Sequence, residues 1–182
     1  MFLNFFKDSP KDRYVILLAI LGLLIVLLVY ILVFIPVEAS VLTYGILDYE
    51  FAWIPDRVLI IFTTWGIDGI SNQILAIYWD FLYIIGYVSL ALGLILIVFR
   101  KTKGQIQTIG FYFILTPFLT GIFDIIENVN LLIMLGNPTS ISIINSLTAS
   151  VCALIKFCFL FAAIGYFLIA LVMIFILKLR KS

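Results

Sequence analysis

The chain has 182 residues, of which 65% are hydrophobic and only 12% are charged, and its mean hydropathy is +1.28. Soluble domains are roughly half apolar and one quarter charged, so this composition excludes a water-soluble globular enzyme and predicts a membrane protein. The formal net charge of +1 offers no basic surface for nucleic acid, and the chain contains no histidine. Haem, zinc and iron sites that need an imidazole, and catalytic groups with a histidine base, are therefore excluded.

The first predicted span, residues 14–36, contains no charged residue and is bounded by Pro36 and Glu38. At about 1.5 Å per residue it is long enough to cross a hydrocarbon core of about 30 Å. The small residues around Val37 and Ala39 also resemble a signal-peptide cleavage site. Because the apolar run exceeds the usual signal core of about 7 to 15 residues, we interpret the segment as a retained span.

Residues 37–75 form the predicted outer loop, which remains half apolar. Pro55 and Asp56 are typical of a helix start, and residues 58–65 predict an interfacial helix with aromatic side chains at headgroup level. Two interpretations stay open, a linker that follows the membrane surface and a lid over the bundle. The loop residues considered for a site are Glu50, Trp53 and Trp65.

Three further predicted spans follow, and each carries charge inside an apolar segment. They are residues 76–99 with Asp80, residues 108–135 with Asp124 and Glu127, and residues 143–177 with Lys156. A basic turn at residues 100–104 and a Gly-Asn-Pro break at residues 136–138 separate them. The sequence therefore predicts one domain over residues 1–182, an all-α integral membrane four-helix bundle with a partly helical interfacial extracytoplasmic loop.

Basic residues accumulate beside the predicted spans on one side. Short cytoplasmic segments next to spans are rich in Lys and Arg, so this pattern predicts a multi-pass plasma-membrane protein with both termini in the cytoplasm. Nine of the eleven basic residues lie on this side, namely Lys7, Lys11, Arg13, Arg100, Lys101, Lys103, Lys178, Arg180 and Lys181. The exceptions are Arg57 in the outer loop and Lys156 in the fourth span.

The charged residues inside the spans share helix faces with other polar residues. The groups are Asp80, Tyr83 and Tyr87 at i, i+3 and i+7 of the second span, Asp124, Glu127 and Asn128 at i, i+3 and i+4 of the third, and Asn145, Ala149, Cys152 and Lys156 along the fourth. Asn130 lies off the common face. Intramembrane charges usually face a bundle interior or a cavity, so these residues are candidates for a site.

Helix geometry predicts that the four ionisable groups meet at one depth. Counted from the predicted cytoplasmic ends, Asp80, Asp124, Glu127 and Lys156 lie about 24 to 31 Å from that side, in the outer leaflet beneath the loop. If all were ionised, three negative charges would surround one positive charge, so we infer a protonated carboxyl or a bound cation. A structural role is the alternative, because a buried ion pair can simply fix helix register.

Cys152 and Cys158 are predicted to be ordinary packing residues. Their spacing on a helix directs them to different faces, so we expect neither a disulfide nor a metal pair. The sequence predicts no cofactor and no metal site.

Several short segments occur in a characteristic order along the chain. They are Gly45–Ala52, Trp65–Gly66, Trp79–Tyr83 with Tyr87, Asp124–Asn128 and Cys152–Phe157. This order, between residues 40 and 165, resembles an uncharacterised family of small four-span prokaryotic integral membrane proteins. The resemblance supplies no substrate. It implies that one constellation contains Glu50, Asp80, Asp124, Glu127, Asn128 and Lys156.

Three functional hypotheses are compatible with this sequence. In the first and favoured one, the bundle and loop bind a lipid, an amphiphile or a partner helix, and the charged cluster orients its polar group. The second is transport of a proton or cation, although few polar residues continue toward the cytoplasmic side. The third is a lipid-modifying enzyme with paired carboxylates that act as acid and base or bind Mg²⁺, although no diphosphate motif is present.

The partners expected from the sequence are membrane lipid and either a second copy of the chain or another membrane protein. No nucleic acid is expected. The sequence assigns no catalytic residue.

Overall fold

The computed structural model describes residues 6–7, 9–41 and 43–179. It is all-helical, with 87% helix and no strand in these residues. The described part of the chain contains four helical stretches that are long and apolar enough to cross a membrane: Asp12–Ala39, Pro55–Lys101, Gln105–Gly136 and Ile143–Leu179. The all-α prediction and the number of apolar helices are therefore confirmed. Arg180 and Lys181, which contributed to the predicted orientation, lie outside the described residues.

The first stretch contains three consecutive helical segments, α2 (Asp12–Val29), the π-helix η1 (Tyr30–Phe34) and α3 (Ile35–Ala39). Pro36 was predicted to end the span, but helical backbone continues through it, from η1 directly into α3. The helix therefore continues to Ala39. A single π turn widens the helix locally and is frequent at functional sites.

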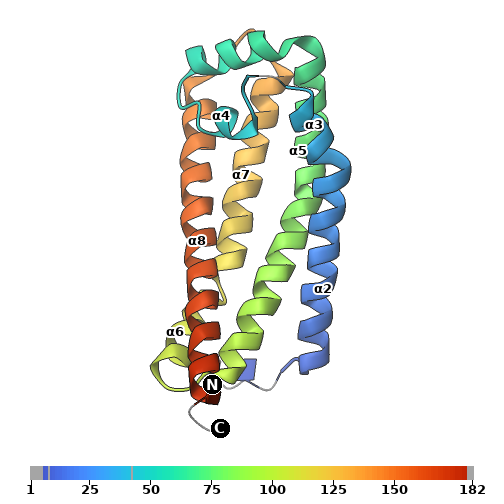
Figure 1. The fold of residues 1–182 in the computed structure, drawn as a ribbon. Helices are drawn as coiled ribbons and strands as arrows, with labels where there is room; N and C mark the ends of the chain where they lie inside the picture. The colour runs from blue at the N-terminus through green and yellow to red at the C-terminus, as the bar shows by residue number, and fades with distance from the viewer. Residues whose placement is uncertain (1–5, 8, 42, 180–182) are drawn as a thin grey trace.

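Helix α4 (Ile46–Glu50) is short, and helix α5 (Pro55–Lys101) has 47 residues. A straight helix of that length would extend about 70 Å, more than twice a hydrocarbon core. The chain instead bends at Gly66, whose φ of 64° is accessible to glycine at little cost. The part of α5 before the bend crosses one end of the bundle, and the part after it runs along the bundle axis (Figure 1).

The predicted outer loop is therefore more helical than the sequence indicated. Residues 58–65 are helical as expected, but residues 67–75, which were assigned to the loop, already belong to the long part of α5. The helix that contains the second predicted span begins before residue 76, because polar residues such as Gln73 lower the local hydropathy without breaking the helix.

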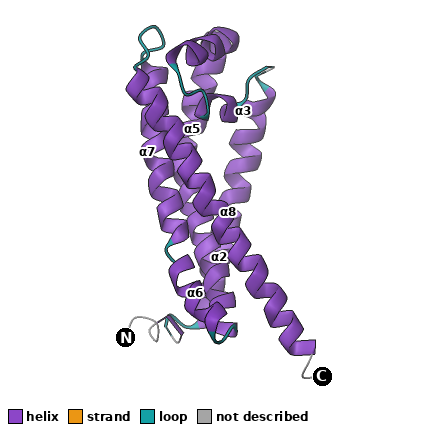
Figure 2. Ribbon diagram, turned by 90° about the vertical axis from the view of Figure 1, so that its left-hand side faces the viewer, coloured by secondary structure: helices purple, strands orange, loops and turns teal. Residues whose placement is uncertain are grey.

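The third apolar stretch consists of two consecutive helices, α6 (Gln105–Phe113) and α7 (Thr116–Gly136). The break lies at residues 114–115, because Pro117 in the first turn of α7 has no N–H to continue the α6 hydrogen bonds. Helix α8 (Ile143–Leu179) has 37 residues, or about 55 Å, and extends beyond the other helices at the end of the bundle near α6 (Figure 2).

The long helices lie side by side, with α5 packed against α2, α7 and α8, and α7 packed against α8 (Figure 1). Two apolar cores lie at opposite ends. The core at the α4 end contains Tyr49, Ala52, Val58, Ile61, Phe62, Trp65, Ile77, Leu131, Met134, Leu135 and Ala149. The core at the α6 end contains Val15, Ile95, Leu96, Val98, Phe99, Ile114, Ala163, Tyr166 and Ala170. The charged residues of the predicted spans lie between these cores.

Small residues bring α2 and α5 very close together in the half of the bundle near α6. A Cβ atom added to Gly22 would lie 2.5 Å from the backbone nitrogen of Leu90 and 2.6 Å from the carbonyl oxygen of Gly86. A Cβ added to Gly93 would lie 2.7 Å from the Cβ of Ala19. Close backbone approach at small residues is a common way for helices to pack where lipid provides no hydrophobic driving force.

The described residues at the α6 end include most of the basic side chains, and one of them joins two helices. Arg100, at the end of α5, donates to Asp12 at the start of α2 over 2.6 Å. At the opposite end, the Arg57 guanidinium lies over the Tyr44 ring and 3.8 Å from an Asp48 oxygen.

Candidate functional site

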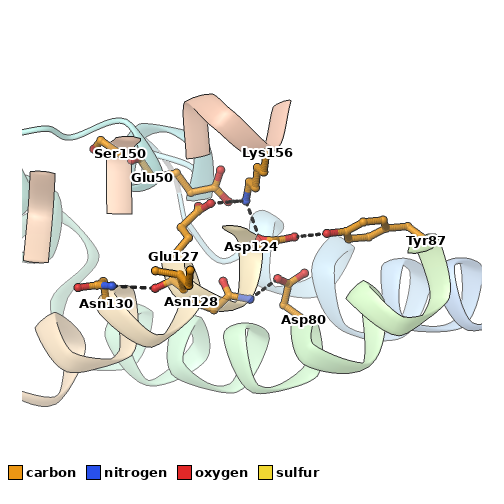
Figure 3. Close-up of polar contacts among 10 residues, drawn as sticks. Glu50, Asp80, Tyr87, Asp124, Glu127, Asn128, Asn130, Ser150 and Lys156 are labelled. Atoms are coloured by element: carbon orange, nitrogen blue, oxygen red, sulfur yellow. Dashed lines mark hydrogen bonds and ion pairs between the residues drawn. The ribbon is translucent and has the colours of Figure 1, made fainter. Parts of the chain in front are cut away.

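Lys156 is the centre of a buried charged cluster. Its Nζ lies 2.8 Å from an oxygen of Asp124, 2.8 Å from an oxygen of Glu127 and 3.4 Å from an oxygen of Glu50 (Figure 3). The exposed fractions are 7% for Lys156, 5% for Asp124, 0% for Glu127 and 8% for Glu50. The structure therefore brings Lys156 of α8 together with one carboxylate of α4 and two of α7.

Helix geometry places two of these carboxylates. Asp124 and Glu127 are three residues apart on α7, so both project from one face toward α8, where Lys156 lies. This arrangement follows the spacing that the sequence shows. Glu50 is different, because it comes from the end of the short helix α4 and its position depends on the turn that follows.

Two serines of α8 hold that turn. Ser150 Oγ donates to the carbonyl oxygen of Glu50 over 2.7 Å and accepts from the backbone N–H of Trp53 over 3.0 Å. Ser146 Oγ donates to the carbonyl oxygen of Trp53 over 3.3 Å. Trp53 has a φ of 62°, which is unusual for a residue with a side chain. The serines thus fix a strained turn that directs Glu50 to Lys156.

Asp80 lies beside the cluster and is paired with Asn128 through a hydrogen bond rather than with a cation. Asn128 donates to Asp80 Oδ2 over 2.6 Å, and Tyr87 donates to Asp124 Oδ2 over 2.8 Å (Figure 3). Asp80 and Tyr87 are seven residues apart on α5, so α5 contributes to both sides of the site. The Asp80–Asn128 pair and the Lys156 cluster with Tyr87 are thus two neighbouring bonded groups, here called the polar network, with contributions from α4, α5, α7 and α8.

The remaining candidates lie at varied distances from this network. Tyr83 lines the adjacent cavity and packs against the rings of Phe34 and Tyr87. Trp65 belongs to the core at the α4 end, where its indole N–H donates to the Tyr44 carbonyl oxygen. Asn130 is half-buried and donates to the carbonyl oxygen of Ile126 in its own helix, away from the network.

Negative charge exceeds positive charge in this network. One lysine contacts three carboxylates, and Asp80 is a fourth carboxylate beside them. Burial raises the pKa of the Glu50 carboxyl above its ordinary value, although the Lys156 ammonium opposes this. One oxygen of Glu50 and both oxygens of Glu127 are buried without any hydrogen bond to the described residues, although Glu127 Oε2 lies in the ion pair with Lys156. Such groups are costly to bury and mark a place where a ligand or a proton can bind.

A cavity of about 600 Å³ lies next to the network. Its lining includes η1 and α3, the end of α4, and the inward faces of α2, α5, α7 and α8. On α5 the lining runs from Gln73 to Leu90, a distance of about 25 Å along the helix axis. The charged residues of its lining are Glu38, Glu50, Asp80, Asp124 and Lys156. The cavity is therefore elongated, with charged groups at a defined level.

Sequence reasoning missed several residues of this region. Gln73 is only 1% exposed and lines the cavity, and its position seven residues before Asp80 was the available signal. Tyr30 and Phe34 line the cavity from the π turn, which no sequence pattern indicates. The polar stripe on α8 was drawn through Asn145, but the hydroxyls that hold the turn belong to Ser146 and Ser150, one step around the helix.

Among the described residues, no group of three His, Cys, Asp or Glu has an arrangement that could hold a metal ion. Cys152 is buried and Cys158 is exposed, and both are free thiols. Comparison with protein-family models, with curated proteins and with solved structures gives no match for this chain. The family resemblance of the sequence stays a prediction, and the site is interpreted from its geometry alone.

Proposed function

We propose that this protein spans the plasma membrane and binds a lipid or another amphiphile in the cavity beside the charged cluster. The observation that carries the proposal is the shape and lining of that cavity. A volume of about 600 Å³ lies in the range of small-molecule pockets, about 300 to 1,000 Å³. An elongated, largely apolar space with charged groups at one level fits a molecule that has an apolar chain and a polar head.

The apolar part of the cavity extends toward the α6 end. Val26, Leu90 and Leu160 line it there, whereas Glu50 and Gln73 line it nearer α4. An amphiphile would therefore place its chain along α5 toward Leu90 and its head near Asp80 and Glu50. This direction agrees with a head that lies near the membrane surface covered by α4.

Transport of a proton or cation is less well supported. Between Asp124 and the α6 end, α7 offers the hydroxyls of Thr120 and Thr116. Thr120 donates to the carbonyl oxygen of Thr116, and Thr116 donates to that of Phe113, so both are already bonded within their own segment of chain. A relay needs groups that can exchange partners, and these do not provide one.

Co-purification tests the binding proposal. Protein extracted gently from its own membrane should carry a bound amphiphile that native mass spectrometry detects. Ala76, which is buried and lines the cavity, provides the variant Ala76→Phe, which should fill the space and remove the amphiphile. Ala162, which is exposed on α8, provides the matched control Ala162→Phe, which should retain it. Wild-type protein without any bound amphiphile would contradict the proposal.

The proposed orientation places the α6 end in the cytoplasm, in agreement with its basic residues. It is tested in a variant without the two native cysteines. A membrane-impermeant maleimide should label Ser140→Cys, in the connection between α7 and α8, on intact cells. It should label Lys103→Cys, between α5 and α6, only after permeabilisation. Both positions are exposed at the surface of the bundle. The reverse labelling pattern would overturn the orientation.

A further inference from the structure

The polar groups that face the cavity have a strong bias toward negative charge and hydrogen-bond acceptors. Four carboxylates line it, those of Glu38, Glu50, Asp80 and Asp124, against the single ammonium of Lys156. That ammonium is already engaged by Asp124, Glu127 and Glu50. A ligand with a negative head would meet uncompensated carboxylates, and a ligand with a positive head would reduce the charge excess.

Asp80 is the carboxylate best placed to contact a ligand. It is only partly buried, it lines the cavity, and no Lys or Arg of the described residues lies within ion-pair distance of it. Its Oδ2 accepts from Asn128, which orients the carboxylate and leaves acceptor capacity on the other oxygen. A carboxylate held in place by a neutral amide, beside an apolar cavity, is suited to bind a cation.

Aromatic rings lie around the same carboxylate. Tyr83 and Tyr87 follow Asp80 on one face of α5, with ring centroids 5.8 Å apart. Phe34, from the π turn, packs against Tyr83 at 5.0 Å, and Tyr30 lines the cavity one turn before it. The negative faces of aromatic rings attract cations, and cages of such rings are a common means to bind ammonium groups.

Unpartnered acceptors at the cavity point to the same chemistry. Glu50 is 8% exposed and lines the cavity, and its Oε2 is buried without a hydrogen-bond partner in the described structure. Gln73 is 1% exposed and lines the cavity, and no hydrogen bond joins its amide to another described residue. A head with several N–H donors would supply what these oxygens lack.

We propose that the head of the bound amphiphile is a protonated amine, held by Asp80 among the rings of Phe34, Tyr83 and Tyr87, rather than a phosphate or a carboxylate. This inference rests on the proposed function, because it presumes that the cavity holds an amphiphile. It adds the charge and the donor character of the head. The two statements can fail separately, and the experiment is designed for that purpose.

The experiment compares three probes that share one chain length. Dodecylamine, dodecanol and dodecanoate are titrated into the purified wild-type protein, Asp80→Asn and Asp56→Asn in maltoside micelles near neutral pH. Dodecylamine is protonated there, since primary amines titrate near pH 10. Asp56 is exposed and does not line the cavity, so Asp56→Asn removes the same charge at a position outside the proposed site. Each affinity is expressed relative to the probe concentration measured in the micelles, so differences in partition between the probes do not enter the affinity ratios.

The wild-type protein should bind dodecylamine about tenfold more tightly than dodecanol, and dodecanoate least tightly. Asp80→Asn should reduce the amine-to-alcohol ratio to about one while it retains dodecanol binding, and Asp56→Asn should keep the wild-type ratio. An equal affinity for amine and alcohol in the wild type, or an unchanged ratio in Asp80→Asn, would overturn the inference and leave the proposed function intact. Failure of all three probes overturns the inference, and together with empty protein in the co-purification experiment it also overturns the proposed function.

Discussion

The two halves of this bundle are built from the same apolar helices but differ in how closely those helices pack. In the half near α6, Gly22, Gly86 and Gly93 allow α2 and α5 to approach until no space for a Cβ remains. Toward α4, the ring of Phe34 in η1 packs against that of Tyr83 in α5, and a cavity of about 600 Å³ opens beside them and reaches as far as Leu90. Residue size thus decides whether a pair of helices forms a closed interface or the wall of a binding site.

Polarity follows the same division. In the half near α6, the closed interface needs few polar contacts, and Arg100 bonds to Asp12 at its margin. In the half near α4, buried charges occur together with unbonded oxygens of Glu50 and Glu127. Buried charges are weak evidence for a contribution to stability, since their desolvation offsets their attraction. Their position beside a cavity, rather than within a closed interface, favours a role in binding.

The largest loss of stability is expected from a substitution in the charged cluster. Lys156→Met removes the ammonium and leaves the carboxylates of Glu50, Asp124 and Glu127 buried together, which should reduce the free energy of unfolding by about 3 to 5 kcal/mol. Unfolding in detergent monitored by circular dichroism measures the loss. Lys178→Met, in the last turn of α8, is the control and should change little. Equal stability of the two variants would show that the protein does not need Lys156 to compensate the buried carboxylates.

The next largest loss of stability is expected at the close contact between α2 and α5. Gly22→Ala places a methyl group against the backbone of α5 and should cost about 1 to 3 kcal/mol. Gly165→Ala, where an added Cβ meets no atom within 4 Å, is the matched control and should be neutral or stabilising by up to about 1 kcal/mol. By contrast, Ala76→Phe places a much larger group where the cavity has room for it, so it should lower the free energy of unfolding by about 1 kcal/mol or less. A larger loss of unfolding free energy for Ala76→Phe than for Gly22→Ala would contradict the account that α2 and α5 are closely packed at Gly22 and that space is available at Ala76.

A smaller effect concerns the hydrogen bond between α5 and α7. Tyr87→Phe keeps the ring but removes the donor to Asp124, which should destabilise the protein by about 1 to 2 kcal/mol. Tyr112, which is exposed on α6, offers the matched substitution Tyr112→Phe, for which no loss is expected. The same unfolding assay distinguishes them. Tyr87→Phe with wild-type stability would mean that Asp124 is satisfied by Lys156 alone.

The smallest effect is a pH dependence at Glu50. Because burial raises the pKa of this carboxyl in the folded protein, the folded state holds its proton more tightly than the unfolded chain does. The contribution of Glu50 to stability is therefore most favourable below its ordinary pKa, about 4.3, and declines as pH rises from that value to the raised one. Glu50→Gln removes this titration, so stability relative to wild type should rise over that interval. A difference that is constant with pH would contradict the assignment.

Periodicity alone indicated much of the fold and part of the site. Asp124 and Glu127 had to share a face of a long helix, and depth counting placed them level with Lys156, with which the structure pairs them. The turn that delivers Glu50 could not be derived in this way. Its conformation depends on hydroxyls of Ser146 and Ser150 that are nearly one hundred residues away in sequence.

The helix boundaries show the same limit of local patterns. Hydropathy placed the start of the second span at residue 76, but helical backbone continues from Gly66 through several polar residues. The cavity itself depends on ring orientations and on the π turn at Tyr30–Phe34, which are set by packing between helices rather than by any local signal.

A structure at high resolution of the protein extracted in a lipid nanodisc from its own membrane tests the central claim most directly. The proposed function predicts elongated density along α5 between Gln73 and Leu90, with its polar end next to Asp80 and its chain toward the α6 end. A cavity that contains only ordered water, or one closed by rotation of Tyr83 and Tyr87 in the presence of native lipid, would contradict it.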